Sequence, residues 1–552
     1  MARCGRAGAR LLGAWLAIAC PSLSSGCNAL VDTSTPQCNT HADCPKRGAE
    51  LAQTYCTAEK ICSRDLPSCT THRDCSEQLG EPGYCRPDRL CTRVLTRECT
   101  EVVPEGALLQ DDVILAGFMG PVRGPFSSHG TPLRQGAALA FDEIETLSNG
   151  IPGVDAESPR RHLALLVCHD TPDGPSTLGR PIHVARHLVE TVGVPAIIGP
   201  SKIPTSVIDI VTEITTPGNV LTISPSATHP GIPKLETGQL FWRTVPSDQF
   251  QVDAWRYLVL GAVASLWESG AIPPTREPRV VYVARADSYG AGLTKLFREQ
   301  IKFSSPPPTW TYDLEKKTDW DNLADEIADV RPELLFAFST GEFATELLPR
   351  LEQRLASAER KPYYLLLDGN RVDELSAAID ENPELSARIL GTAPGVRTTT
   401  LFNAFRGRFI GTFVQEPGSL AEFAYDAAYL LAYAVAGAKN QEPSGVELGA
   451  ALSALSCPNG TRVVADPSEF SDGFQAAARD ACVNFEGASG PLDFDNEMGE
   501  APNLFAVWCA GRDESGKPFP SLRGLYYDPN VANPGVKGLA EDELLPFCPA
   551  AR

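Results

Sequence analysis

The feature that most constrains the fold of this chain is an alternation of short apolar runs with amphipathic segments, which begins near residue 111. Runs such as "DVILAGF" (112–118) and "PAIIGP" (195–200) have the length of strands, and each is followed by a loop rich in Gly, Pro, Ser or Thr. Between the runs, apolar residues recur at intervals of three and four, which is typical of helices packed on one face. Continuous apolar strands separated by helices predict a parallel sheet that is covered on both faces.

The alternation occurs as two successive series, and the second begins near residue 279. Together they predict strands at 112–118, 162–170, 195–200, 219–226, 279–285, 333–340 and 362–369, and helices at 133–147, 181–193, 206–215, 290–302 and 342–356. In such sheets, ligands lie beyond the carboxyl ends of the strands, where this chain has polar and glycine-rich loops. The sequence therefore predicts an α/β protein with two doubly wound parallel-sheet lobes and a hinged cleft between facing loops.

A small repeated unit rich in cysteine precedes these lobes. The segment "CNTHADC" (38–44) aligns with "CTTHRDC" (69–75), and "YCTAEKIC" (55–62) aligns with "YCRPDRLC" (84–91). An internal repeat indicates one small unit used twice. Cysteine at this density predicts a disulfide scaffold, which persists only outside the reducing cytosol.

We expect disulfides to involve fourteen of the 17 cysteines: Cys38, Cys44, Cys56, Cys62, Cys69, Cys75, Cys85, Cys91, Cys99, Cys168, Cys457, Cys482, Cys509 and Cys548. Four cysteines per copy allow three pairings, and the sequence does not choose among them. Proximity in the sequence suggests Cys457–Cys482 and Cys509–Cys548.

A metal site is the alternative, because His41 and His72 lie in the repeat. Zinc sites favour two to four residues between paired cysteines, whereas this repeat has five, so we expect neither a metal nor another cofactor. A spacer, a wall contact and a protein-docking unit all remain open as roles for the repeat.

The amino terminus reads as a lipoprotein signal. Three arginines precede the apolar "LLGAWLAIA" (11–19), which is too short to span a bilayer. Cys20 and Cys27 both follow small residues and are both candidates for lipidation. If Cys4 and Cys20 leave with the signal and Cys27 carries lipid, 17 − 2 − 1 = 14 cysteines remain, which is an even number. We therefore predict a signal peptide at 1–26, a lipid anchor at Cys27 with Cys20 as the alternative, and a tether at 27–36. This places the exported protein at the periplasm or cell surface, attached to a bacterial membrane.

Charge and motifs exclude several function classes. A formal net charge of −21 repels phosphate backbones and argues against nucleic acid as a partner. The apolar stretch 421–438 contains Glu422 and Asp426, which predicts a buried helix rather than a membrane span. The chain contains no G-x-S-x-G, P-loop, H-E-x-x-H or G-x-G-x-x-G motif, so we do not expect an enzyme.

Six pieces of sequence, taken in order, carry a resemblance to a known family: "PAIIGPS", "ISPSATHP", "FWRTVPSDQFQ", "ADSYGAGL", "FAYDAAYLLAYAVAGA" and "FEGASGPLDFDNEMG". From about 111 to 508 the chain resembles the type I periplasmic solute-binding proteins, in the leucine/isoleucine/valine-binding branch that serves ABC transporters. In that family the chain crosses between the lobes three times. The resemblance thus implies a bilobed domain at 100–552 after a cysteine-rich module at 37–99. It divides the domain into lobe one (about 111–246 and 390–485) and lobe two (about 247–389 and 486–548).

The resemblance also implies a ligand site between the lobes. In lobe one, backbone N–H groups and hydroxyls of two loops receive a ligand carboxylate; in lobe two, an acidic residue receives the ammonium group beside an aromatic ring. A desolvated carboxylate needs donors and an ammonium needs an anion, since unpaired buried charge is costly. The matching residues are Ser226, Ala227 and Thr228 for the carboxylate, Tyr289 for the ring and Asp368 for the ammonium. In the first carboxylate loop, "GPSKIPTS" departs from the family pattern and offers Ser201 or Thr205, and Ser127 lies on another strand-end loop.

The expected function follows from this resemblance. It implies a receptor that captures an amino acid or similar small polar metabolite, with an ABC permease as a partner for import. The alternative is a lipid-anchored surface protein that senses or binds other proteins with the same fold and without transport, because a transport receptor does not require the cysteine-rich repeat.

Overall fold

The computed structural model describes residues 66–171, 180–201, 207–314, 316–395, 397–479, 482–512 and 521–531, with shorter pieces at 38, 43–44, 55–56, 60–63, 516, 518–519 and 534–537. The chain divides into two compact units, residues 1–65 and 66–552. The boundary falls between the two copies of the cysteine repeat, so the copies that the sequence groups as one module at 37–99 belong to different units.

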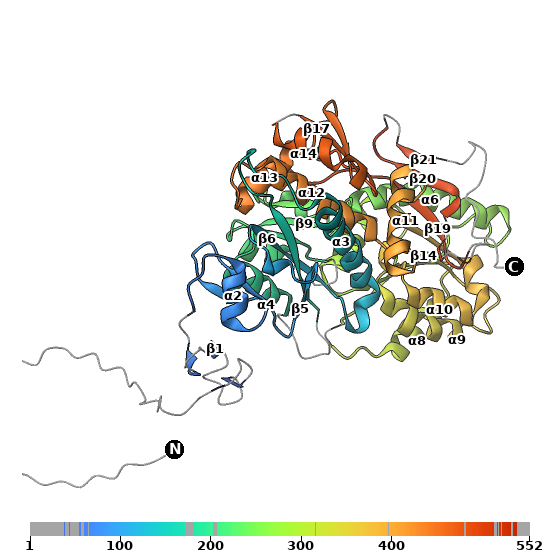
Figure 1. The fold of residues 1–552 in the computed structure, drawn as a ribbon. Coiled ribbons are helices and arrows are strands. Elements are labelled where there is room, and N and C mark those ends of the chain that lie inside the picture. Colours follow the sequence, from blue (N-terminus) through green and yellow to red (C-terminus); the bar gives the residue numbers. More distant parts are fainter. Residues whose placement is uncertain are drawn as a thin grey trace, which may run out of the picture. The chain divides into compact units, whose positions relative to one another are not determined.

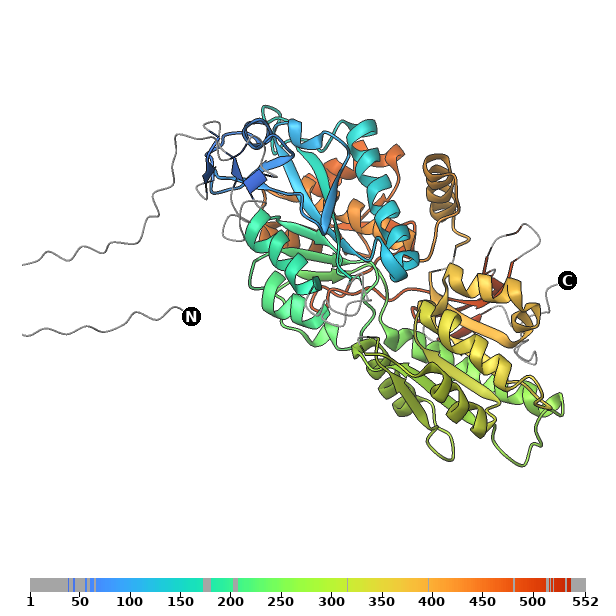
Figure 2. The same ribbon diagram turned by 90° about the horizontal axis from the view of Figure 1, so that it is seen from below.

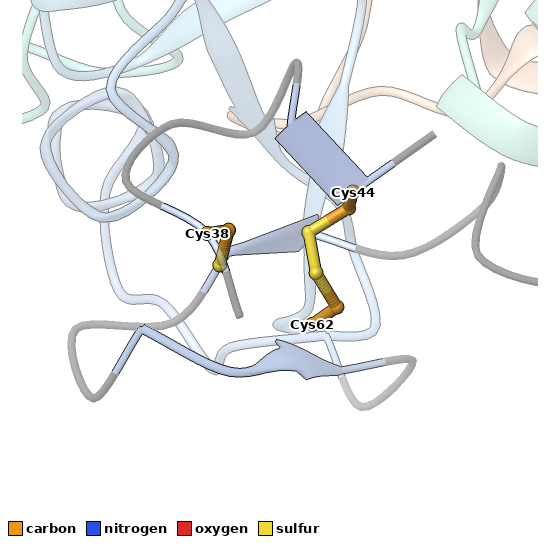
Figure 3. Close-up of side chains that lie close together, drawn as sticks. All are labelled: Cys38, Cys44 and Cys62. Atoms are coloured by element: carbon orange, nitrogen blue, oxygen red, sulfur yellow. A yellow bond between two sulfur atoms is a disulfide. The ribbon is translucent and has the colours of Figure 1, made fainter. Parts of the chain in front are cut away.

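The first unit contains the first copy of the repeat. Strands β1 (Tyr55–Cys56) and β2 (Cys62–Ser63) form an antiparallel pair, and a disulfide joins Cys44 to Cys62. Figure 3 shows the Cys38 side chain beside this disulfide, and the three sulfur atoms lie within 4.8 Å of one another. Cys38 is also disulfide-bonded. A metal binds thiolate rather than disulfide sulfur, so oxidation gives these cysteines a structural role. The Cys56 side chain, the signal segment and both candidate lipidation sites lie outside the described residues.

The second copy is a small disulfide-linked fold at the start of the second unit. Helix α2 (His72–Leu79) is followed by the hairpin of β3 (Gly83–Cys85) and β4 (Cys91–Arg93), and disulfides join Cys69 to Cys85 and Cys75 to Cys91. These bonds link the first cysteine of the copy to the third and the second to the fourth, which settles the pairing that the sequence left open. The spacing of threonine and aspartate that the two copies share also has a cause here, because Thr71 and Asp74 cap α2 reciprocally.

The first lobe is built on a six-stranded sheet in the order β10-β9-β8-β6-β7-β5. All strands are parallel except the edge strand β5, which pairs antiparallel with β7. The strands are β5 (Cys99–Val103), β6 (Val113–Gly120), β7 (His162–His169), β8 (Ala196–Ile198), β9 (Leu221–Ser224) and β10 (Phe241–Arg243). The helices along this stretch are α3 (Ser127–Ser148), α4 (Arg180–Arg186) and α5 (Val207–Ile210), and the last two continue as π-helical turns.

The second lobe, much of which is green and yellow in Figure 2, contains an eight-stranded sheet in the order β12-β11-β13-β14-β15-β19-β20-β21. Its first five strands are parallel and its last three are antiparallel. They are β11 (Val280–Arg285), β12 (Thr309–Tyr312), β13 (Leu334–Phe338), β14 (Tyr363–Leu366), β15 (Ile389–Pro394), β19 (Phe505–Cys509), β20 (Ser521–Asp528) and β21 (Gly535–Lys537). Its helices are α6 (Asp248–Glu268), α7 (Ser288–Gln300), α8 (Trp320–Val330), α9 (Leu348–Arg354) and α10 (Asp373–Glu381).

The chain returns to the first lobe between β15 and β19. This return contains α11 (Thr400–Phe413), α12 (Ala421–Gly437), α13 (Gly445–Ser453), α14 (Phe470–Ala478) and the small sheet β16 (Thr461–Val464), β17 (Val483–Gly487) and β18 (Gly490–Pro491). The chain therefore leaves the second lobe after Pro394 and rejoins it at β19, through a crossing segment in which Phe494 and Ala501 still belong to the core cluster of the first lobe. The Cys457–Cys482 disulfide suggested by the sequence is present, and Cys509 is disulfide-bonded, whereas Cys548 lies outside the described residues.

Helix α12 is the centre of the first lobe. It lies side by side with α3 (Figure 1), and sixteen of its residues are buried. This confirms the buried helix predicted from Glu422 and Asp426. Glu422 forms an ion pair with Arg397, and Asp426 accepts the N–H groups of Ala488 and Ser489. Among the residues described, no helix has the length and hydropathy to cross a membrane.

Candidate functional site

The loops after β8 and β9 are joined at the carboxyl edge of the first sheet. Ser224, the last residue of β9, donates its hydroxyl to the Pro200 carbonyl (2.8 Å) and accepts the Ala227 N–H (3.0 Å). The loop of Ser226, Ala227 and Thr228 is fully buried as a result. In this structure the Ala227 N–H, which the resemblance assigns to a ligand carboxylate, is thus used to shape the loop.

A buried acid lies beside this loop. Asp170 follows β7, is completely buried, accepts the Thr171 hydroxyl (2.9 Å) and lies close to Ser201. Burial raises the pKa of Asp170 to about 7, because the interior disfavours the charged carboxylate. Ser201, one of the two candidates in the first carboxylate loop, is therefore part of the site edge; Thr205, the other, and Lys202 lie outside the described residues.

Arg243 holds the same loop from the other side. It ends β10 and is completely buried, and its Nη1 donates to the carbonyls of Ala227 and His229 (both 3.1 Å). Its Nη2 forms an ion pair with Glu500, which lies on the last crossing between the lobes. One guanidinium group therefore ties the Ser226–Thr228 loop to a crossing segment.

The carboxyl edge of the second sheet is charged. Arg285 ends β11, is 2% exposed, forms an ion pair with Asp287 and donates to the Thr340 hydroxyl (3.3 Å). Glu342 accepts the Tyr312 hydroxyl (2.5 Å) and the Thr340 N–H (3.0 Å). A pocket of about 720 Å³ opens beside these loops, and its lining includes Phe126, Trp320 and Glu342.

Tyr289 and Asp368 meet at this edge. The Tyr289 hydroxyl lies 2.9 Å from the position that a Cβ atom would take on Gly369, so it abuts the backbone next to Asp368. Burial raises the pKa of Tyr289 well above its usual value, and the nearby charges of Asp368 and Asp248 raise it further. Asp248 connects the two edges, because its N–H donates to the Thr228 carbonyl (2.9 Å) in the loop of the first lobe.

The predicted site residues therefore fall into three groups. Tyr289 and Asp368 lie together, and Asp248 connects them to the loop that contains Ser226, Ala227 and Thr228. Ser201 lies beside Asp170 at the first sheet edge. Ser127 begins α3, and its neighbour Ser128 has a buried hydroxyl; neither this hydroxyl nor that of Thr228 has a hydrogen-bond partner among the described residues.

Sequence reasoning missed several residues that shape this site: Asp170, Ser224, Arg243, Asp248 and Arg285. Asp170 and Arg285 end predicted strands and Ser224 lies near the end of another, which is a signal the sequence contained. The strand that ends at Arg243 and the helix that begins at Asp248 were not predicted. Arg243 and Asp248 even belong to the quoted motif "FWRTVPSDQFQ". The sequence did not indicate which of these polar residues turn inward.

Comparison with known proteins identifies the family and the fold. A family model described as periplasmic binding protein matches residues 114–481. The leucine-binding protein LivK of Thermotoga maritima MSB8 is 17% identical, with a TM-score of 0.52, and the match covers 76% of this chain and 99% of LivK. The branched-chain amino acid transporter substrate-binding protein LivJ of Streptococcus pneumoniae, solved with isoleucine, is 20% identical, with a TM-score of 0.52 and coverage of 74% and 100%.

A third similar structure is the solute-binding protein of an ABC transporter from R. palustris, solved with 4-hydroxybenzoate. It is 14% identical, with a TM-score of 0.52, and the match covers 74% of this chain and 96% of that protein. A search of curated protein sequences gave no match. At these identities the solved structures establish a shared fold, and their ligands differ in chemistry.

Proposed function

Because the chain belongs to the periplasmic binding protein family, we propose that it is a solute receptor that binds an amino acid or a similar small polar metabolite and delivers it to an ABC importer. The family implies an extracytoplasmic location. The observation that carries the proposal is the meeting of Tyr289, Asp368 and Asp248 beside the loop that contains Thr228.

The two edges supply complementary groups for such a ligand. Asp368 offers a buried carboxylate for an ammonium group, and the Tyr289 ring forms an adjacent wall. The buried hydroxyls of Thr228 and Ser128 offer donors for a carboxylate. A ligand that unites the two charges satisfies both edges at once, which is the physical reason to favour a zwitterion over a purely apolar metabolite.

The test is a thermal-denaturation screen of the protein without its signal segment against amino acids and small polar metabolites. A true ligand at one hundred times its dissociation constant stabilises the folded state by about 2.7 kcal/mol and raises Tm. Asp368→Asn should remove the response to amine-bearing ligands. Asp373→Asn is the matched control, because Asp373 is exposed on α10. A panel with no shift, or an Asp368→Asn protein that responds as the wild type does, would contradict the proposal.

We also propose that lipid on Cys27 attaches the protein to a bacterial membrane. The support is the signal-like sequence and the even number of remaining cysteines, of which twelve are disulfide-bonded. A Cys27→Ser protein should appear in the soluble fraction of cells, whereas Cys20→Ser should not. Membrane attachment of the Cys27→Ser protein would contradict this assignment.

A second candidate function is sensing or protein interaction at the cell surface without transport. It is favoured by the first copy of the repeat, which belongs to a compact unit separate from the lobes. Deletion of the gene distinguishes the two functions. Loss of uptake of the identified ligand supports transport, whereas unchanged uptake together with loss of a ligand-triggered response supports sensing.

A further inference from the structure

The second copy of the cysteine repeat is part of the core of the first lobe. Tyr84 and Val94 belong to the same buried cluster as the strand residues Leu115 and Leu166. His72 stacks on Tyr84, with ring centroids 4.5 Å apart, and its Nδ1 accepts the Cys85 N–H (3.0 Å). Its Nε2 therefore holds the proton and donates to the Val113 carbonyl at the start of β6 (3.1 Å). The copy is thus fastened to the sheet rather than linked to it by a free tether.

The chain leaves this copy through a short, internally bonded turn, which we call the exit segment (residues 94–99). Val94 is completely buried, and His187 bonds its carbonyl (3.2 Å). The Thr96 hydroxyl accepts the N–H groups of Glu98 (3.1 Å) and Cys99 (2.9 Å), and the Thr96 N–H donates to the Cys99 carbonyl (2.8 Å). These hydrogen bonds fix the backbone conformation of the exit segment.

The exit segment contacts two of the loops at the candidate site. Its Glu98 carbonyl accepts the His169 N–H (2.8 Å), and a disulfide joins Cys99 to Cys168, so that two bonds hold the chain immediately before Asp170. The Arg97 carbonyl of the exit segment accepts a hydrogen bond from Nη2 of Arg123 (2.9 Å). Arg123 lies in the loop that leads to Ser127 and Ser128.

The strand that follows extends these contacts to helix α3. In β5, Glu101 forms an ion pair with Arg134 of α3, whose first turn contains Ser127 and Ser128. The antiparallel pairing of β5 with β7 runs from Cys99 opposite Cys168 to Val103 opposite Leu165. The loops after β6 and β7 are therefore held by one continuous stretch, residues 94–103, that belongs to neither strand–helix series.

We propose that the second cysteine-rich copy is a positioning element of the ligand site, which acts through the exit segment and the Cys99–Cys168 disulfide to hold the loops after β6 and β7. Loops at strand ends open locally at low free energy unless other bonds restrain them. The restraint is a property of the protein without ligand, and its consequence for affinity rests on the proposed function. Asp170 and Ser128 are the site residues that the restraint places.

Hydrogen exchange of the ligand-free protein tests this proposal. In a Cys99→Ser/Cys168→Ser double variant, amides at 121–128 and 169–171 should exchange about tenfold faster than in the wild type, because local opening no longer has to break the cross-link. The matched control is Cys457→Ser/Cys482→Ser, which removes a disulfide of the same lobe that joins the segment after α13 to the start of β17. The control should lower Tm and leave exchange at 121–128 and 169–171 unchanged. Equal acceleration at these amides in both variants, or in neither, would overturn the proposal.

A second variant covers the case in which the double variant does not fold. Thr96→Val keeps every cysteine and removes the hydroxyl that shapes the exit segment. It should accelerate exchange at His169 and Asp170, and unchanged exchange there would count against the proposal. A wild-type protein that binds nothing in the thermal screen would contradict the proposed function while leaving the exchange comparison intact, so the two failures are distinguishable.

Discussion

The carboxyl edges of the two sheets both border the candidate ligand site, but they present different kinds of side chains to it. At the first edge, neutral groups predominate: Ser224 joins two loops through its hydroxyl, and Thr228 and Ser128 hold buried hydroxyls. At the second edge, Arg285 pairs with Asp287, and Asp368 lies beside Tyr289. The contrast is between hydrogen-bonding loops and a cluster of buried charges.

This difference means that the two lobes of the proposed receptor would contribute different interactions to ligand binding. A loop shaped by its own hydrogen bonds offers directional donors at little electrostatic cost, whereas a buried carboxylate binds a cation strongly but must be compensated in its absence. Arg371 supplies that compensation near Asp368 in lobe two, and its pKa is lowered to about 9 chiefly by burial. Two ionisable residues, Arg243 and Asp170, lie at the first edge among its neutral groups, and substitutions of these residues test the comparison.

The largest effect is expected from Arg243→Met. The variant loses two hydrogen bonds to the Ser226–Thr228 loop and leaves Glu500 buried without its partner, so the free energy of unfolding should fall by about 3–5 kcal/mol. Arg256→Met is the matched control, because Arg256 is exposed on α6 and its change should be within about 0.5 kcal/mol. Chemical denaturation measures both variants. A loss below 1 kcal/mol for Arg243→Met would show that neutral bonds alone hold the first edge.

An intermediate effect is expected from Asp170→Asn, and it depends on pH. Burial raises the pKa of Asp170 from 3.8 to about 7 in the folded protein, so the folded state binds a proton that the unfolded state has released between these values. The wild type should therefore lose stability as pH rises from about 5 to 7, by about 2 kcal/mol. Asp170→Asn should lack this component. Parallel Tm profiles of the two proteins between pH 5 and 8 would contradict the assignment of a raised pKa.

The smallest effect is expected from a matched pair at the first edge. Ser224→Ala removes two hydrogen bonds and should cost about 1–2 kcal/mol, because the Ala227 N–H and Pro200 carbonyl lose their partner. Thr228→Val removes a buried hydroxyl without a partner among the described residues, so its stability should change by less than about 0.5 kcal/mol. Denaturation curves compare the two, and a cost for Thr228→Val equal to that of Ser224→Ala would show that Thr228 has a structural role.

Local patterns determined much of this fold. The apolar runs at 112–118 and 279–285 became β6 and β11, because uninterrupted apolar strands are stable only inside a covered sheet. The buried α12 followed from an apolar stretch interrupted by two acids that cannot enter a bilayer without partners. The cysteine repeat predicted disulfides, because such a small unit has too little apolar surface to fold without cross-links.

The tertiary structure alone decided which distant groups meet. The two copies of the repeat share one motif, and the motif does not show that Tyr84 and Val94, at the second copy, enter a core cluster with the sheet of lobe one. The pairing of Cys99 with Cys168, 69 residues apart, and of Arg243 with Glu500 depends on how the strands align. The periodicity of apolar residues shows which side of a helix or strand is buried, because each buried position selects for an apolar side chain independently of the others. Contacts such as these depend on the register between elements far apart in the chain, and that register is set by packing.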